Sequence, residues 1–409
     1  MDFSLTPDQK LFRDAVREYL SETLGKIWRK ADEEHRLPSE VIRRLGEQGL
    51  YAIPVPEEYG GQGGSFTLAA IALEEIGYAD PALATAVYTL LNNAWPYVLY
   101  LYGTEEAKQE ILPMVGSGRG FFGIASTEPQ GGSDVAGFRT RAEKHGDRYR
   151  IYGEKTFISG VREVMEQVEL GGWFLIARTG TMEEKHRGLS AFAFIGNRGG
   201  KKPEGLEYGV LPTIGRHGIS TGTLTFNGAE VEAKYLIGEE GRGFYVAMEG
   251  FNLARILVSA ASIGSARWAL EQAVEWARQR RMFGDRPIAS FQGVSFPLAE
   301  AHVAIESARM LVYKAAWLAD KIYVEKDPAY KPKDLGMASA SAKIAAVEAA
   351  FKTYETAMKT FGALAYTKEI DVFRGLLGVI SYLAGAEGAQ NIMRYIVARE
   401  LIGKEHVKW

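Results

Sequence analysis

The sequence predicts a mainly α-helical protein with a small central β domain, a sheet or barrel, and a C-terminal four-helix bundle. Three observations lead to this prediction. Helical periodicity fills residues 1–119, β-branched and aromatic runs bounded by turn residues fill 120–236, and long helical periodicity returns over 237–409. A chain of 409 residues also exceeds one hydrophobic core, so we interpret these segments as three domains.

The N-terminal segment reads as helices joined by one glycine-rich loop. Thr6 and Gln9 have the spacing of a capping box at the start of the first helix. The loop covers Tyr59–Gly64, and helical periodicity resumes after it over Leu68–Ile76 and Leu83–Leu101. Pro96 lies in the last of these stretches and is expected to kink or interrupt the helix.

The middle segment predicts strands, and the C-terminal segment predicts long helices. The strand candidates are 173–177, 189–194 and 223–226, with a solvated loop over Gly196–Gly205. The helices are expected at 245–283, where Gly284 and Pro287 end the first, and then at 291–321, 336–361 and 387–401. Their richness in Ala, Ser and Gly favours close packing in a bundle.

Composition excludes several classes of function. A net charge of −3 and scattered basic residues argue against nucleic-acid binding. The chain has no cysteine, which excludes disulfides, thiolate catalysis and cysteine-ligated metals, and its six histidines show no metal-ligand spacing. We find no signal peptide and no charge-free apolar stretch long enough to span a bilayer, so we expect a cytoplasmic protein without a metal.

The region Gly123–Gly160 contains the strongest candidate site. Small hydroxyl residues surround Gly131 and Gly132, where backbone N–H groups can close on a flat or anionic ligand. Phe157 and Ser159 lie two residues apart and so share one face of a strand, where an aromatic plane beside a hydroxyl suits a flavin ring. Taken alone, such a cluster is more often an ordinary turn. The hydroxyl residues are Ser126, Thr127 and Ser133.

A second candidate is the carboxylate of Glu387, which follows the charge-free stretch Leu376–Ala386. Apolar surroundings would raise its pKa toward neutrality, as a general base requires. The alternative is an acid that stabilises the first turn of a helix. With Ile392, Arg394 and Ala398-Arg399-Glu400 downstream, the segment and the Gly123–Gly160 region together resemble the acyl-CoA dehydrogenase family, almost end to end.

This resemblance implies an FAD-dependent enzyme. Glu387 would remove the α-proton of an acyl-CoA while hydride passes from the β-carbon to flavin N5, giving a trans-2-enoyl-CoA. Position 254 is alanine, so the acid that some members place there is absent. The residues implied to bind FAD are Ser126, Thr127, Gly132, Ser133, Phe157, Ser159, Arg280, Phe283, Gln292, Gly362 and Asn391, and those implied to bind substrate are Ser133, Asn252, Arg255 and Gly388.

The resemblance also implies partners. Arg280, Phe283 and Gln292 would reach across a subunit interface to the adenosine diphosphate half of FAD, as expected of a homodimer or a dimer of dimers. Electrons would pass to an electron-transferring flavoprotein in fatty-acid β-oxidation. Two alternatives remain open: an oxygen-reactive flavin, as in acyl-CoA oxidases, and a catalytically altered relative that serves as a binding or assembly module.

Several positions depart from the family pattern. Gly362 is followed by Ala363 and Ala365 where further glycines are usual, and Leu377-Gly378 replaces an Arg-Asp pair, so FAD binding is expected to differ at the diphosphate half. The acyl pocket is expected along the helix containing 90–95 and at Ala386, whose small side chain leaves room for a branched or cyclic chain. We place no arginine to meet a second carboxylate, which disfavours dicarboxylic substrates.

Overall fold

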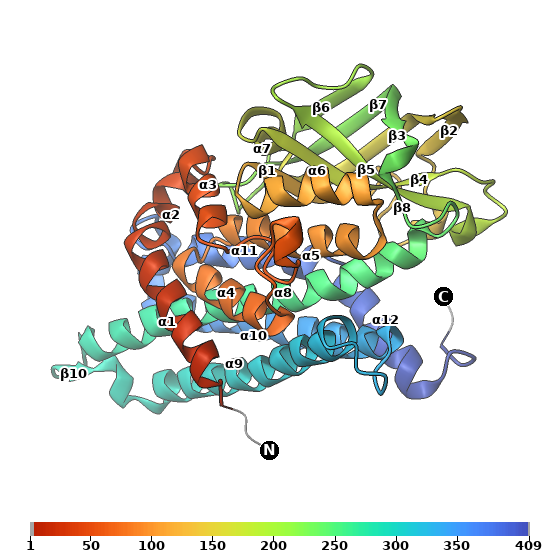
Figure 1. Cartoon of the computed structure of the whole chain (residues 1–409). Coiled ribbons are helices and arrows are strands. Elements are labelled where there is room, and N and C mark those ends of the chain that lie inside the picture. Colours follow the sequence, from red (N-terminus) through yellow and green to blue (C-terminus); the bar gives the residue numbers. More distant parts are fainter. Residues whose placement is uncertain (1–3, 408–409) are drawn as a thin grey trace.

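The computed structural model describes residues 4–407 and confirms the predicted fold class. Figure 1 shows the sheet above a layer of N-terminal helices, with the long C-terminal helices below them. Thr6 and Gln9 form the predicted capping box. The N-terminal helices are α1 (Pro7–Glu22), α2 (Leu24–Glu33), α3 (Ser39–Glu47), α4 (Phe66–Ala79), α5 (Ala84–Tyr102) and α6 (Glu105–Gly116).

Pro96 was expected to kink or interrupt α5, and it does not interrupt it, since the helix runs unbroken through this residue. A proline has no N–H, so the carbonyl of Asn92, four residues earlier, loses its helical donor. That carbonyl instead accepts a hydrogen bond from the Ala52 backbone N–H at 2.9 Å. The loop between α3 and α4 thus satisfies the group that the proline leaves free.

The central domain is one mixed eight-stranded sheet in the order β6-β7-β3-β2-β4-β5-β8, with β1 added in parallel to β4. The predicted strands at 173–177, 189–194 and 223–226 are confirmed within β4, β5 and β7. The predicted loop 196–205 is shorter, because β5 continues to Arg198. The strands are β1 (Gly120–Ala125), β2 (Arg141–His145), β3 (Arg148–Ser159), β4 (Leu170–Arg178), β5 (Leu189–Arg198), β6 (Leu206–Val210), β7 (Thr221–Glu232) and β8 (Leu236–Ile237), and helix α7 (Val161–Glu166) follows β3.

The bundle has more helices than predicted. Its first helix ends at Gln279 rather than at 283, because β9 (Arg281–Met282) and β10 (Arg286–Pro287) form a small hairpin there. The apolar stretch before Glu387 forms a helix that we did not predict, and the last helix begins at Gln390 rather than at 387. The helices are α8 (Gly243–Gln279), α9 (Gln292–Ala319), α10 (Pro332–Phe361), α11 (Val372–Ala384) and α12 (Gln390–Ile402), with a π-helical turn over Asp320–Val324.

Helix α8 is the central helix of the fold and packs against α4, α5, α9 and α10. Among residues 4–407 it alone is long and apolar enough to cross a membrane, but 78% of its apolar window is buried inside the protein. Core packing therefore accounts for its hydrophobicity. Gly264 of α8 permits the contact with α4, because an added Cβ would lie 1.8 Å from the Glu74 carbonyl oxygen.

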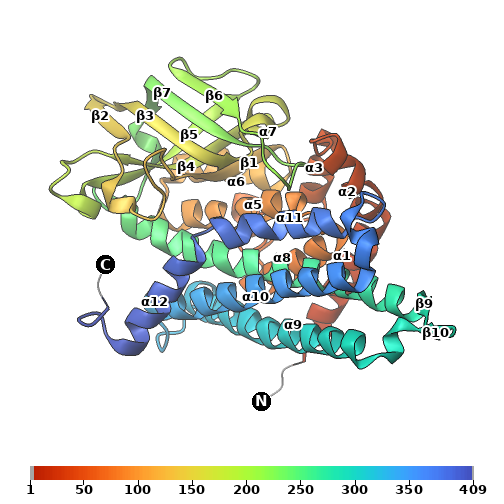
Figure 2. The same cartoon turned by 180° about the vertical axis from the view of Figure 1, so that it is seen from behind.

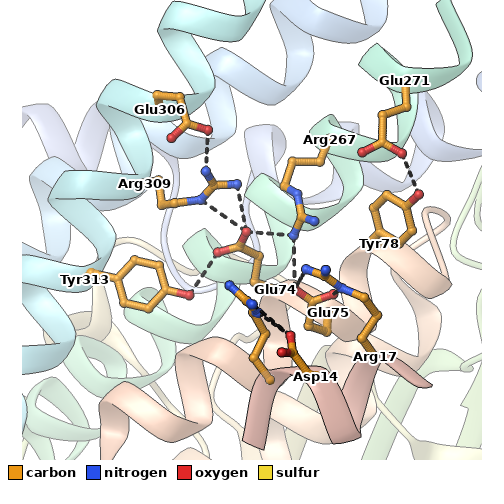
Figure 3. Close-up of polar contacts among 11 residues, drawn as sticks. Asp14, Arg17, Glu74, Glu75, Tyr78, Arg267, Glu271, Glu306, Arg309 and Tyr313 are labelled. Carbon is orange, nitrogen blue, oxygen red and sulfur yellow. Dashed lines mark hydrogen bonds and ion pairs between the residues drawn. The ribbon is translucent and has the colours of Figure 1, made fainter. Parts of the chain in front are cut away.

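A buried ionic cluster ties α1, α4, α8 and α9 together (Figure 3). Glu74 of α4 accepts hydrogen bonds from Arg267 of α8 at 2.8 Å and from Arg309 of α9 at 2.9 Å. Its neighbour Glu75 pairs with Arg17 of α1 at 2.9 Å. Burial raises the pKa of Glu75, but the arginines more than offset this effect and hold it below its usual value. The cluster thus fixes the N-terminal domain on the bundle.

Candidate active site

The glycine-rich loop after β1 is held by a buried ion pair that sequence reasoning missed. Lys155 of β3 donates hydrogen bonds to the Ser126 carbonyl and to the Glu128 carboxylate, both at 2.8 Å. Glu128 also accepts from the Thr140 N–H at 2.9 Å. Both charged side chains are at most 2% exposed, and burial lowers the Lys155 pKa to about 8 although Glu128 opposes this. The sequence feature that could have pointed to this ion pair is the position of Lys155, two residues before Phe157 in a segment predicted as a strand.

The structure places the predicted hydroxyl residues along this loop. Ser126 is buried, Thr127 is half-buried, and Gly132 and Ser133 are exposed. A Cβ at Gly132 would lie 3.1 Å from the Thr127 hydroxyl, so the glycine leaves that hydroxyl uncrowded. The loop therefore presents polar groups beside a backbone that another molecule can approach closely.

Phe157 and Ser159 lie at the end of β3, close to this loop through the bond from the Thr156 N–H to the Thr127 carbonyl at 2.9 Å. The strand is irregular here, with a register shift between Lys155 and Ile158 and a positive φ of 58° at Phe157. Ile158 is buried between them, as expected if Phe157 and Ser159 share the other face. The Phe157 ring is 68% exposed, an unusual position for a phenylalanine held in a strained conformation.

Glu387 does not lie in a helix, so the alternative role in a first helical turn is wrong. It belongs to the segment Gly385–Ala389 between α11 and α12, which we call the Glu387 turn, and it has a φ of 56°. Its Oε2 atom is buried and has no hydrogen-bond partner among the described residues. Burial raises the pKa of Glu387 to about 7, against the opposing charges of three nearby cations.

Those cations are Lys343, Arg255 and Arg216, and two of them bond to the Glu387 turn. Arg255 of α8, a predicted site residue, donates from Nε to the Glu387 carbonyl at 3.1 Å and from Nη1 to Asn252 at 2.8 Å. Lys343 of α10 donates to the Gly388 carbonyl. Lys343 was not predicted, because a lysine within a long helix normally marks a solvated face.

Arg216 was also missed by sequence reasoning. Its side chain is 8% exposed, donates to the Thr221 hydroxyl at 2.9 Å and forms no ion pair with any residue from 4 to 407. Thr221 pairs with Ser159 across β7 and β3, so the guanidinium lies beside the predicted flavin residues. The expectation that no arginine meets a second carboxylate of the substrate stays a prediction.

Side chains of α5 that were expected to line an acyl pocket are all buried. The Asn92 side chain accepts a hydrogen bond from the Phe122 N–H at 3.0 Å, which ties α5 to β1. The Trp95 ring contacts Phe174 and Phe251 at centroid distances of 5.0 and 5.4 Å. Asn92 and Trp95 therefore hold the N-terminal helices, the sheet and α8 together. Leu90 and Leu91 are buried apolar side chains.

The departures from the family pattern on α11 have a packing explanation. Leu377 lies so close to Gly215 that a Cβ added to the glycine would be 2.5 Å from the Leu377 Cβ. A Cβ added to Gly378 would likewise be 2.4 Å from the Ala82 carbonyl oxygen. Arg374, one turn earlier, forms the inter-element ion pair with Asp32 at 2.6 Å. The contact between α11 and the N-terminal domain thus combines close backbone approach with the ion pair of Arg374 and Asp32.

The residues implied to bind the adenosine diphosphate half of FAD lie elsewhere. Arg280 follows α8, Gln292 begins α9, and Phe283 lies in the intervening hairpin, 79% exposed. This hairpin projects from the end of the bundle opposite α12, far from the sheet (Figure 2). One chain therefore does not bring these residues to Phe157 and Glu387.

Gly362 and Asn391 are exposed, on different helices. Gly362 ends α10 with a φ of 65°, and an added Cβ would meet nothing there, while Asn391 lies in the first turn of α12. Of the two alanines that follow Gly362, Ala365 is buried and Ala363 is exposed. Of these two methyl groups, only that of Ala363 is therefore placed where it can hinder a ligand that approaches the backbone after Gly362.

Comparison with known proteins identifies the family. Sequence profiles described as acyl-CoA dehydrogenase N-terminal, middle and C-terminal domain match residues 6–119, 123–229 and 241–402. The chain belongs to the acyl-CoA dehydrogenase family. It is 35% identical over 323 residues to an acyl-CoA dehydrogenase of Bacillus subtilis, covering 78% of this chain and 80% of that protein.

Two further relatives match almost the whole chain. Isobutyryl-CoA dehydrogenase of Dictyostelium discoideum is 32% identical, with 98% of this chain and 91% of that protein covered. The structure of butyryl-CoA dehydrogenase from Megasphaera elsdenii has a TM-score of 0.87 and 29% identity, covering 98% of this chain and 100% of the other. This protein is therefore an oxidoreductase of a flavoprotein family.

The residues present fit the FAD that the family implies. The loop after β1 offers an uncrowded Thr127 hydroxyl, and Phe157 presents an exposed ring beside Ser159. An exposed ring in a left-handed conformation is unfavourable without a ligand, and a flat heterocycle packed on it would compensate.

Proposed function

We propose that this protein catalyses the FAD-dependent α,β-dehydrogenation of an acyl-CoA, with Glu387 as the base that removes the α-proton. The observation that supports this most directly is the buried Glu387 carboxylate, whose Oε2 has no partner among residues 4–407 and whose pKa is raised to about 7 by burial. A base with a pKa near the working pH is both deprotonated and able to accept a proton. The product would be a trans-2-enoyl-CoA.

The other site residues would bind the flavin, bind the thioester and set the charge around the base. Ser126, Thr127, Phe157 and Ser159 would hold the flavin ring, and bound FAD would accept the hydride. The Glu387 backbone N–H has no acceptor among the described residues, so it is free to bind the thioester oxygen. Arg255, Lys343 and Arg216 place positive charge around the carboxylate, which partly offsets the effect of burial and keeps the Glu387 pKa near neutrality.

For the substrate, we propose a branched acyl chain. Ala386 precedes the base, and its methyl leaves space beside the reacting carbon atoms. The Dictyostelium relative named isobutyryl-CoA dehydrogenase supports this choice. Since Arg216 is buried and forms no ion pair within the described part of the chain, dicarboxylic acyl-CoAs belong in the same test.

The experiment is anaerobic mixing of the FAD-loaded protein with straight, branched, cyclic and dicarboxylic acyl-CoAs while the visible flavin band is recorded. We expect the band to bleach fastest with a branched chain. The rate should rise with pH to a plateau, with a midpoint at about 7, because only deprotonated Glu387 accepts the proton. Bleaching by none of the compounds would reject the proposal, and a preference for straight chains would reject its substrate part.

Electron acceptors separate dehydrogenase from oxidase. We propose an electron-transferring flavoprotein as acceptor, in keeping with the family. Reduced enzyme should then transfer electrons to such a flavoprotein and produce little hydrogen peroxide in air. Rapid oxygen consumption with peroxide release would instead identify an oxidase.

We also propose a homo-oligomer in which one subunit completes the FAD site of its partner. Phe296, Val303, Met310 and Trp317 recur every seven residues on α9 and are 43–62% exposed, so they form one apolar stripe. The hairpin with Phe283 projects from the same bundle and cannot reach the site of its own chain. A second copy is the partner that would use both features, as a dimer or a dimer of dimers.

Replacing Val303 with glutamate should disrupt this assembly, because a charge in an apolar interface is costly to bury. We expect a smaller species by sedimentation velocity and a loss of bound FAD. The matched control is Leu11→Glu, an equal change at a residue that is 72% exposed on α1, which should leave the assembly intact. A wild-type protein that sediments as a monomer while retaining FAD would contradict the proposal.

A further inference from the structure

Two neighbouring helices hold the Glu387 turn by consecutive carbonyl groups. Arg255 of α8 bonds to the Glu387 carbonyl at 3.1 Å, and Lys343 of α10 bonds to the Gly388 carbonyl. The two turn residues have positive φ values of 56° and 106°. A residue with a side chain, such as Glu387, adopts this region only at a cost in free energy. The two bonds therefore stabilise the conformation that presents the Glu387 carboxylate.

The two helices that carry these cations are also bonded to one another. Arg255 bonds to the Asn252 side-chain oxygen at 2.8 Å, and Ser339 of α10 bonds to the same oxygen at 3.2 Å. Ser339 lies four residues before Lys343 on α10, about one helical turn away. Helices α8 and α10 are therefore bonded to one another through Asn252 and Ser339 close to the point where both hold the Glu387 turn.

Folding alone does not explain a lysine at this place. Lys343 is 0% exposed and forms no ion pair with any residue from 4 to 407. Burial and the charge of Arg255 lower the Lys343 pKa to about 7, while Glu387 acts in the opposite direction. Neighbours such as Ala342 and Ala346 are buried and apolar, and an apolar side chain would avoid the cost of burying an unpaired amine.

We propose that Lys343 is a positioning residue, which fixes the Glu387 turn through the Gly388 carbonyl and sets the proton affinity of the Glu387 carboxylate. This inference rests on the proposed role of Glu387 as base. It assigns Lys343 no proton transfer with the substrate, since its bond is to the backbone of the turn.

The groups around Glu387 determine how large the effect should be. Lys343 faces it from α10, Arg255 from α8, Arg216 from the segment before β7 and Tyr382 from α11. Burial raises the pKa of Tyr382 well above its usual value, so this hydroxyl stays neutral. Removing Lys343 leaves two arginines in place, and the Glu387 pKa should therefore rise by about one unit rather than revert to that of a wholly unpaired acid.

The test compares Lys343→Met with Lys343→Arg and with Lys352→Met, an exposed lysine on the same helix. In the FAD-loaded enzyme, Lys343→Met should lower kcat by about 10- to 100-fold with KM little changed. Its pH midpoint should move up by about one unit, and Lys343→Arg should largely restore it because charge and donor are kept. Lys352→Met should match wild type.

Hydrogen–deuterium exchange gives a readout that does not depend on activity. Amides of the peptide that covers Gly385–Gln390 should exchange faster in Lys343→Met and unchanged in Lys352→Met. If Lys343→Met does not fold, Lys343→Gln, which keeps a donor without the charge, takes its place. Unchanged exchange together with an unchanged pH midpoint would overturn the proposal. A wild-type enzyme that no acyl-CoA reduces would count against the proposed function instead, and the exchange comparison would still decide whether Lys343 holds the turn.

Discussion

Glu387→Gln should reduce the rate of flavin reduction by acyl-CoA by about 10⁴-fold, the upper range for loss of a general base. Glutamine has nearly the same shape but cannot accept the α-proton. The FAD-loaded variant should stay yellow for minutes after anaerobic mixing with a substrate that bleaches the wild type at once. Stopped-flow absorbance at the flavin band measures both rates.

The control for this substitution is Glu400→Gln on α12, an exposed carboxylate that pairs with Lys404. It carries the same chemical change thirteen positions along the chain and should leave the rate within a factor of two of wild type. Equal losses in the two variants would show that Glu387 has no special role. Substrate binding gives a second check, because Glu387→Gln should still bind acyl-CoA.

Glu74→Ala should destabilise the fold by about 3–5 kcal/mol, the cost of removing one partner from a buried ion pair. Arg267, Arg309 and Tyr313 all bond to this one carboxylate, at distances from 2.8 to 3.0 Å (Figure 3). Without it two arginines keep their charge in a largely buried position, and the contact between α4, α8 and α9 weakens. Thermal unfolding followed by circular dichroism should show a clearly lower midpoint.

Glu306→Ala is the matched control, because Glu306 bonds to the same Arg309 but its side chain is 45% exposed. Exposed ion pairs contribute about 0–1 kcal/mol, so this variant should unfold close to wild type. A similar loss in both variants would mean that the cluster acts through surface charge rather than through burial.

Local sequence signals predicted the fold class well. Hydrophobic periodicity located the long helices of both α domains, although not α11, and the strands β4, β5 and β7, because each signal lies within the segment that it describes. Expectations failed where hydrogen bonds to another segment, distant or nearby, decided the backbone conformation. Pro96 was expected to kink or interrupt α5, but the helix is not interrupted, and the Ala52 N–H satisfies the carbonyl that the proline leaves free. The helix α8 was expected to run to 283, but strand pairing with Arg286 and Pro287 ends it earlier.

The candidate site shows the same division. The motifs around Gly132, Phe157 and Glu387 are contiguous in sequence, so they and the family they resemble were readable from the chain alone. Lys155, Arg216 and Lys343 were not, because their local sequence does not establish whether a lysine or arginine is buried or solvated. Only tertiary packing decided that these three cations are buried and that Arg216 and Lys343 lie near Glu387. The physical reason is that their pKa values and partners depend on contacts between residues 27 to 171 positions apart in the chain.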